Sequence, residues 1–274
     1  MQDKTISRPD QSSSNSCAAI IVAAGSGVRA ASTSKFASRQ DSPFEPDNFA
    51  INNFGNDLPK QFWRLGDKPV IAHAFNYFHY HPAIAAIILV VAEPFIPHMA
   101  DILPETQKPV HLVAGGATRQ DSVHAGLTAL AGLKNCQNID YVAIHDAARP
   151  LIPTNLLDSL IAAINNTNDK KQVNEIIGAV PVLPLADSIK TIDKDNSHDN
   201  PTSRRGLITG GIDRSKLAAA QTPQLFRREI ITKLHDDFAG KGGFTDDCSL
   251  AEAAGFKITM IYGCLLYTSD AADE

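Results

Sequence analysis

Six short segments of the chain carry glycines, charged side chains or hydroxyls that could contact a ligand. The first is AAGSGVR (23–29), in which Gly25 and Gly27 follow an apolar run and Arg29 comes two residues later. Glycine lets the backbone approach a ligand, and backbone N–H groups in such a turn bind phosphate oxygens. The guanidinium of Arg29 adds a permanent positive charge with several donors. The segment indicates a phosphate-binding loop, and a tight turn between a strand and a helix is the alternative.

Two further motifs add a lysine and a second glycine turn. LPKQF (58–62) contains Lys60, although a lysine in a loop is most often only a solvated charge. In AGGATRQDSV (114–123) the glycines again follow a strand-like run, so the backbone at Gly116 and the hydroxyl of Ser122 are suited to contact the edge of a base. The alternative for this motif is the entry turn of another helix.

A carboxylate and an arginine stand at the end of another apolar run. In AIHDAARPLI (143–152), Asp146 follows the run and Arg149 comes three residues later. Open α/β sheets bind ligands at the carboxyl ends of their strands, and a carboxylate there can hold Mg²⁺ directly or through water. A helix cap or an Asp–Arg ion pair is the more common use of these residue types and stays open as the alternative.

Two motifs further along the chain are less specific. AAQTPQLF (219–226) contains Thr222 before a proline and is also typical of a plain turn. FTDDCSLAEAAG (244–255) predicts a helix with Thr245 as its N-cap and acidic residues in its first turn. We expect any substrate contact from this last motif to be secondary.

Short apolar runs alternate along the chain with segments of helical periodicity. The runs are almost continuously apolar, as in strands buried on both faces, and lie at 18–24, 84–92, 110–113, 140–145 and 176–182. The helical patterns lie at 69–80, 93–103, 118–131 and 154–165. This alternation predicts an α/β fold with a mainly parallel sheet flanked by helices.

Two polar stretches depart from this alternation. Residues 31–58 have no periodicity and predict an inserted loop. Residues 186–215 predict a projecting β-hairpin arm, with strands at 187–192 and 207–212 and a long polar tip between them. Because an exposed hairpin needs a partner to cover it, we expect this arm to make a dimer contact.

The composition argues against several classes of protein. The chain has 274 residues and a formal net charge of −5, which argues against nonspecific binding to nucleic acid. No apolar run approaches the length of about 18 residues that spans a membrane, and the polar segment 1–16 predicts a disordered tail rather than a secretory signal. The four cysteines form no CxxC pair, so we expect a reducing, cytoplasmic location and no zinc site.

Five motifs of the chain, taken in order, resemble those of the 2-C-methyl-D-erythritol 4-phosphate cytidylyltransferase family of the non-mevalonate isoprenoid pathway. They are AAGSGVR, PKQF, GGATRQDSV, HDAARP and TPQLF. The resemblance covers residues 17–263, and HDAARP and TPQ are more specific than the glycine loop. It implies a Rossmann-like nucleotidyltransferase fold, a homodimer with interlocking β-arms, the substrates CTP and 2-C-methyl-D-erythritol 4-phosphate, and Mg²⁺ as cofactor.

The resemblance also implies roles for individual residues. The positions that correspond to CTP-binding residues are Ala23, Ala24, Gly25, Gly27, Gly116, Arg119, Ser122 and Asp146. The positions that correspond to acceptor-binding residues are Asp146, Arg149, Ser188, Arg214 and Thr222. Of these, Ser188 and Arg214 would reach the acceptor bound to the other subunit. The implied catalytic cations are Arg29, Lys60 and Arg214, and Asp146 is the implied Mg²⁺ ligand.

Three features depart from the family pattern. The loop at 31–58 separates Arg29 from Lys60, which are closer in sequence in the family. Ser188 stands where a threonine is often found, although the hydroxyl is kept. Segment 264–274 is an atypical tail without the family's Asn-x-Lys-(Ile/Val)-Thr stretch, whose lysine is a catalytic cation. We therefore expect a family-like fold with impaired activity.

Three alternative functions compete with this interpretation. A ribitol 5-phosphate cytidylyltransferase shares most of the motifs, and the sequence separates the two acceptors poorly. A catalytically inactive CTP-binding or scaffolding protein is favoured by the missing lysine and opposed by Arg29, Lys60, Asp146 and Arg214. A nicotinamide-dependent oxidoreductase needs a second strand and an acidic ribose ligand after GSGVRA, and the loop at 31–58 predicts no such strand.

Overall fold

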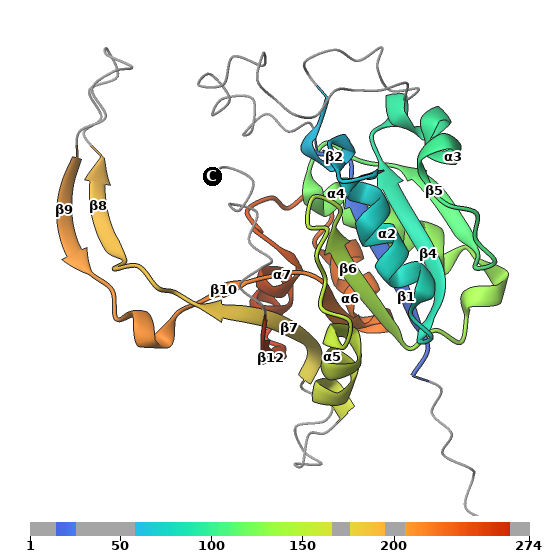
Figure 1. The fold of residues 1–274 in the computed structure, drawn as a ribbon. Coiled ribbons are helices and arrows are strands. Elements are labelled where there is room, and N and C mark those ends of the chain that lie inside the picture. Colours follow the sequence, from blue (N-terminus) through green and yellow to red (C-terminus); the bar gives the residue numbers. More distant parts are fainter. Residues whose placement is uncertain (1–14, 26–57, 166–175, 195–205, 264–274) are drawn as a thin grey trace, which may run out of the picture.

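The computed structural model describes residues 15–25, 58–165, 176–194 and 206–263 (Figure 1). Several predictions concern residues outside these ranges and are not tested by the structure. They are those for Gly27, Arg29, the tail at 264–274, residues 1–14 of the tail at 1–16, and residues 31–57 of the loop at 31–58. In the described part of the chain, no helix combines the length and the apolar character that crossing a membrane requires.

One mixed sheet of eight strands forms the centre of the described structure (Figure 1). Its strands are β1 (Cys17–Ala23), β4 (Ile84–Val91), β5 (Val110–Ala114), β6 (Tyr141–Asp146), β7 (Ile176–Pro184), β10 (Ala218–Ala220), β11 (Gln224–Arg227) and β12 (Lys257–Tyr262). The order across the sheet is β10-β7-β11-β6-β1-β4-β5. Since β11 and β12 both pair with Ala179 of β7, they lie along opposite edges of that strand.

The predicted parallel core of the sheet is confirmed. β1 pairs in parallel with β4 on one side and with β6 on the other, and β5 pairs in parallel with β4. β1 and β4 are continuously apolar, as expected for strands that helices cover on both faces. In contrast, β11 is antiparallel to both β6 and β7. This strand begins within the TPQLF motif, for which the sequence predicts only a turn.

Helices form two layers around the sheet. They are α2 (Val70–Tyr80), α3 (Met99–Ile102), α4 (Arg119–Ala131), α5 (Leu156–Asn165), α6 (Arg228–Asp237) and α7 (Asp247–Ala253). Buried side chains of α2, α3 and α5 pack with one face of β1, which carries Ala19 and Ile21. Those of α4, α6 and α7 pack with the other face, which carries Ala18 and Ile20. Figure 1 shows α2 in front of β4 and β1.

The helices differ from the sequence predictions at three places. The segment predicted as one helix over 93–103 is a 3-10 helix, η5 (Glu93–His98), followed by the short α3, and Pro94 and Pro97 in η5 lack the backbone donors of an α-helix. The N-cap of α7 is Asp246 rather than Thr245, and its carboxylate accepts from Ser249 N–H at 2.9 Å. Helix α6 is not among the predicted helices.

The predicted arm is present as a separate two-stranded sheet. Strands β8 (Lys190–Lys194) and β9 (Gly206–Gly211) pair antiparallel and extend away from the central sheet (Figure 1). Large apolar side chains on both strands are exposed, with Ile192 at 59%, Leu207 at 74% and Ile208 at 70%. These surfaces are not covered by the rest of the described chain.

Gly178 allows β7 and β11 to approach each other, and this gives a test of the fold. A Cβ at Gly178 would lie 2.5 Å from Cδ1 of Phe226 and 2.9 Å from the carbonyl oxygen of Leu225. We expect Gly178→Ala to lower the free energy of unfolding by about 1–3 kcal/mol, measured by urea denaturation. Gly242→Ala is the control, since a Cβ there meets no atom within 4 Å. Equal stability of the two variants would contradict this packing.

Candidate active site

Apart from the arm residues Ser188 and Arg214, the predicted site residues that the structure describes lie around the carboxyl ends of the parallel strands. Hydrogen bonds hold these ends together: Ala147 N–H donates to the carbonyl of Val22 at 2.9 Å, and Gly115 N–H donates to that of Val91 at 2.9 Å. The loops that follow β1, β5 and β6 therefore start from one edge of the sheet. This is the edge at which open α/β sheets bind ligands.

Gln61 joins the Lys60 segment to the end of β1. Its amide Nε2 donates to the carbonyl oxygens of Ala23 at 2.7 Å and Gly25 at 3.0 Å. Gln61 is buried in the 3-10 helix η4 (Lys60–Phe62), and the Nζ of Lys60 lies 6.0 Å from the ring centroid of Trp63. The segment that carries Lys60 is thus joined to the end of β1. Gln61 is a site residue that the sequence prediction missed, although it belongs to PKQF.

The backbone at Gly115 and Gly116 is tightly packed against neighbouring residues. A Cβ at Gly115 would lie 2.1 Å from Cβ of Ala24, and a Cβ at Gly116 would lie 2.3 Å from Cβ of Asp121. A Cβ at Gly25 would meet no atom of the described residues within 4 Å. The prediction that the backbone at Gly25 meets a phosphate stays a prediction.

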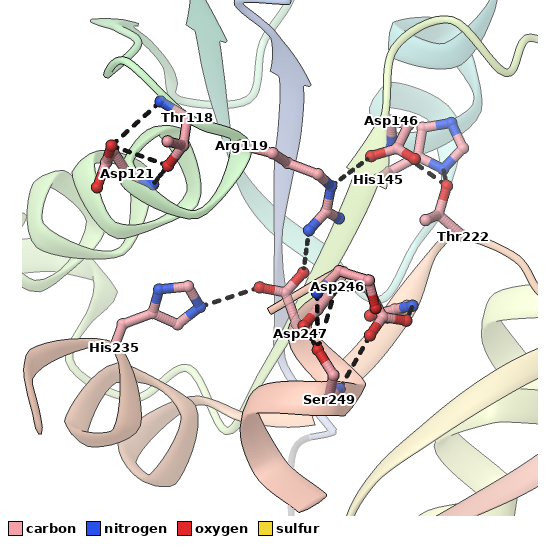
Figure 2. Close-up of polar contacts among 12 residues, drawn as sticks. Thr118, Arg119, Asp121, His145, Asp146, Thr222, His235, Asp246, Asp247 and Ser249 are labelled. Atoms are coloured by element: carbon pink, nitrogen blue, oxygen red, sulfur yellow. Dashed lines mark hydrogen bonds and ion pairs between the residues drawn. The ribbon is translucent and has the colours of Figure 1, made fainter. Parts of the chain in front are cut away.

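The start of α4 shapes the second glycine turn. Thr118 and Asp121 form a capping box, in which each side chain accepts from the backbone N–H of the other at 3.1 Å (Figure 2). The buried hydroxyl of Ser122 accepts from Gly116 N–H at 3.1 Å and donates to the carbonyl of Thr118 at 2.9 Å. Ser122 thus uses its hydroxyl within the turn, and the prediction that it contacts a base stays a prediction.

Asp146 lies between two arginines at the end of β6. Its Oδ1 accepts from Nε of Arg119 at 3.0 Å (Figure 2). Its Oδ2 lies 3.5 Å from Nε of Arg149. The Asp–Arg ion pair that the sequence left open is therefore present, with Arg119 as the closer partner. The side chain of Asp146 remains 32% exposed, so one of its edges is accessible to a ligand.

A chain of hydrogen bonds fixes the backbone of this loop. Asp146 N–H donates to the hydroxyl oxygen of Thr222 at 3.2 Å, and this oxygen lies 3.1 Å from Nδ1 of His145. Nε2 of His145 lies 2.9 Å from the carbonyl oxygen of Arg149. Burial lowers the pKa of His145 to about 4, so the ring is neutral at neutral pH. The geometry assigns the proton to Nε2, which leaves Nδ1 to accept from Thr222.

Behind Asp146, Arg119 contacts a second and more deeply buried carboxylate. Its Nη1 donates to Oδ2 of Asp247 at 2.8 Å, and Nε2 of His235 lies 2.9 Å from Oδ1 of Asp247 (Figure 2). Burial alone would raise the pKa of Asp247, but the charge of Arg119 and the hydrogen bond from His235 outweigh it and lower the pKa to about 2. Neither Asp247 nor His235 is among the predicted site residues.

The arginine still has one unused donor. Nη2 of Arg119 is buried and makes no hydrogen bond to the described residues. A buried donor without a partner is unfavourable, and a ligand oxygen or water would satisfy it. The prediction that Arg119 contacts the nucleotide stays a prediction.

The geometry suits a divalent cation shared with a ligand better than a preformed metal site. In the described residues, no three His, Cys, Asp or Glu side chains gather so that they could hold a metal ion. The accessible edge of Asp146 offers one carboxylate. Mg²⁺ is commonly held by one or two carboxylates together with substrate phosphates and water, so the residues present fit that mode.

The two predicted arm residues are separate from this group. Ser188 is exposed just before β8. Arg214 starts the 3-10 helix η7 (Arg214–Lys216) after β9 and donates to the carbonyl of Ala186. Within one chain, the described structure places Asp146, Arg149, Thr222 and Arg119 together but does not add the arm residues to them.

The Thr222 hydroxyl gives a test of how the loop is held. We expect Thr222→Val to lower the free energy of unfolding by about 1–3 kcal/mol, because Asp146 N–H and Nδ1 of His145 would lose their partner in a buried place. Thr222→Ser keeps the hydroxyl and is the matched control. The measurement is urea denaturation at neutral pH, and a valine variant as stable as the serine variant would contradict the network.

Comparisons with known proteins agree with this arrangement. The family model for 2-C-methyl-D-erythritol 4-phosphate cytidylyltransferase matches residues 52–266. A protein of that name from Cereibacter sphaeroides is 35% identical over 248 residues, which cover 90% of this chain and 88% of the relative. A "Bifunctional enzyme IspD/IspF" from Rhizorhabdus wittichii is 34% identical, and here the chain spans 51% of the relative's length.

A solved structure shows the same fold. The 4-diphosphocytidyl-2C-methyl-D-erythritol synthase of Anaerococcus prevotii aligns with a TM-score of 0.66 at 20% sequence identity, covering 93% of this chain and 92% of that chain. The predicted Rossmann-like nucleotidyltransferase fold is confirmed. From the family match and the identity to relatives of similar length, the chain belongs to the 2-C-methyl-D-erythritol 4-phosphate cytidylyltransferase family.

Proposed function

We propose that the chain transfers CMP from CTP to 2-C-methyl-D-erythritol 4-phosphate, giving 4-diphosphocytidyl-2-C-methyl-D-erythritol and pyrophosphate in isoprenoid precursor biosynthesis. The observation that carries the proposal is the family match over residues 52–266. That range contains the cation Lys60, the carboxylate Asp146 and the loop network around them.

The reaction explains why the site consists mainly of charged groups and backbone donors. An oxygen of the acceptor phosphate attacks the α-phosphorus of CTP and forms a new P–O bond. The bond from that phosphorus to the oxygen bridging to the β-phosphate breaks, and pyrophosphate leaves with the electron pair. A phosphate monoester is already an anion near neutral pH, so no strong base is needed. The main obstacle is repulsion between two anions, which positioning and positive charge overcome.

The residues at the first two loops would bind CTP. Ala23, Ala24 and Gly25 would meet the nucleotide with their backbone at the end of β1. Lys60 would balance charge on the triphosphate from its place beside this loop, and Arg29 would do so from the segment outside the described residues. Gly116 and Ser122 would read the cytosine.

The residues at the β6 end would bind the acceptor and the metal. Asp146 would hold Mg²⁺ together with phosphate oxygens, and Arg149 and Thr222 would stand beside the acceptor. When bound, Mg²⁺ would neutralise charge on the phosphates. Arg119 would keep the carboxylate of Asp146 in place.

We further propose a homodimer in the cytoplasm. The exposed apolar side chains of β8 and β9 support a partner-covered arm, from which Ser188 and Arg214 would reach the acceptor in the other subunit. The described cysteines Cys17, Cys136 and Cys248 are buried and free, which supports a reducing compartment.

The reaction is tested by pyrophosphate release from CTP and Mg²⁺, with 2-C-methyl-D-erythritol 4-phosphate or ribitol 5-phosphate as the acceptor. We expect release with the first acceptor and much less with the second.

Lys60→Gln should lower kcat about 10²- to 10³-fold, because a cation near the triphosphate is lost. Lys68→Gln is the control, since Lys68 is exposed on the hairpin formed by β2 (Arg64–Leu65) and β3 (Lys68–Pro69). Preference for ribitol 5-phosphate, or equal rates in the two variants, would contradict the assignment.

The dimer is tested by the mass in solution. Sedimentation should give about twice the chain mass of 29.4 kDa. We expect Leu207→Asp to shift this toward the monomer, because a charge would be buried in the arm contact. Tyr80→Asp, at a residue of α2 that is 73% exposed, should leave the mass unchanged. A monomeric wild-type chain would overturn the proposal.

A further inference from the structure

We propose that Asp247 is a positioning residue of the nucleotide site: supported by His235, it holds Arg119 in the orientation in which Arg119 fixes the Asp146 carboxylate. This inference rests on the proposed function, because it takes Asp146 and Arg119 as parts of the CTP site. Asp247 itself would touch neither substrate.

The geometry of the arginine carries the first step. Nε of Arg119 donates to Asp146 at 3.0 Å and Nη1 donates to Asp247 at 2.8 Å. The guanidinium is planar and rigid, so hydrogen bonds from two of its nitrogens to two carboxylates set both its position and its plane. Figure 2 shows Arg119 between the two carboxylates, with Asp146 on the β6 side and Asp247 on the α7 side. A displaced Asp247 would therefore release one side of the arginine.

The burial of the two carboxylates separates their roles. The side chain of Asp146 is 32% exposed and that of Asp247 is 2% exposed. A ligand can reach Asp146, whereas the influence of Asp247 must pass through Arg119. A buried carboxylate is unfavourable unless it is paired and hydrogen-bonded, and Asp247 has both kinds of partner in Arg119 and His235.

His235 connects this pair to the helix layer behind the sheet. It is 1% exposed on α6, and its Nε2 lies 2.9 Å from Oδ1 of Asp247. With one oxygen bound by Arg119 and the other by His235, the carboxylate of Asp247 cannot rotate without losing a contact. Helices α4, α6 and α7 thus each contribute one member to the support of Asp146.

The neighbouring residue Asp246 shows that Asp247 is not needed to start α7. Asp246 is the N-cap and forms a capping box with Ser249, and it also accepts from Nε2 of Gln224 at 2.8 Å. Asp247 is the first residue of the helix, and its side chain is directed to Arg119 instead. Of the two adjacent carboxylates, that of Asp246 caps the helix and that of Asp247 positions Arg119.

This pair gives a matched experiment. Asp247→Asn and Asp246→Asn each remove one charge with little change of shape, and asparagine remains a good N-cap at 246. We expect Asp247→Asn to lower kcat/KM for CTP about 10- to 100-fold, as is usual when a supporting partner of a site carboxylate is lost. Asp246→Asn should stay within about threefold of wild type. The same order should appear in the Kd for CTP measured by calorimetry.

A double-mutant cycle distinguishes positioning from a general structural defect. In the background of Arg119→Gln, the change Asp247→Asn should cause no further loss in kcat/KM, because its route to Asp146 is already removed. Losses that multiply would overturn the proposal. Should Asp247→Asn fail to fold, His235→Gln tests the same support from the other side, with an expected loss of about 3- to 10-fold. Wild-type kinetics in that variant would also overturn it.

CTP binding by the wild-type chain distinguishes a failure of the positioning role from a failure of the proposed function. A wild-type chain that binds CTP, with equal Kd values for Asp247→Asn and Asp246→Asn, would overturn the positioning role alone. A wild-type chain that binds no CTP would overturn the proposed function and this inference together.

Discussion

The placement of the Asp146 carboxylate depends on polar contacts from its own loop and from two segments that are far away in sequence. Arg119 on α4 and Arg149 in the following turn approach its oxygens, and Thr222 before β11 accepts from its backbone N–H. Each such contact contributes only about 1–3 kcal/mol, but the loss of one leaves a buried group without a partner. Because these segments meet only when β6 lies between β1 and β11, the site depends on the strand order of the sheet.

Much of the fold could be predicted from the sequence because the core strands are buried on both faces. β1, β4 and β6 are continuously apolar and stand at the predicted places. β11 is missed because a run of four residues after a proline carries no strand pattern of its own, and its register is set by β6 and β7. Helix α6 does carry a signal, since Ile231 and Leu234 are buried three positions apart.

The types of the site residues could be predicted more fully than their partners. Glycine turns, Lys60 and Asp146 stand out locally because each follows a recognisable run. The link from Arg119 to Asp247 joins residues 128 positions apart, and no local spacing indicates it. By sequence, Asp247 is only an acidic residue in the first turn of a helix, and His235 belongs to a helix that was not predicted. The sheet and its rear helix layer bring them together.

The most direct test of this account is a crystal structure of the chain with CTP and Mg²⁺ in the absence of acceptor. We predict that the triphosphate lies over the carboxyl ends of β1 and β6, between Lys60 and Asp146, with the base against the turn at Gly115 and Gly116. Arg119 should keep its contacts to both carboxylates. Nucleotide bound away from this edge of the sheet, for example in the groove lined by Tyr80 and Leu151 between α2 and the segment before α5, would contradict the account.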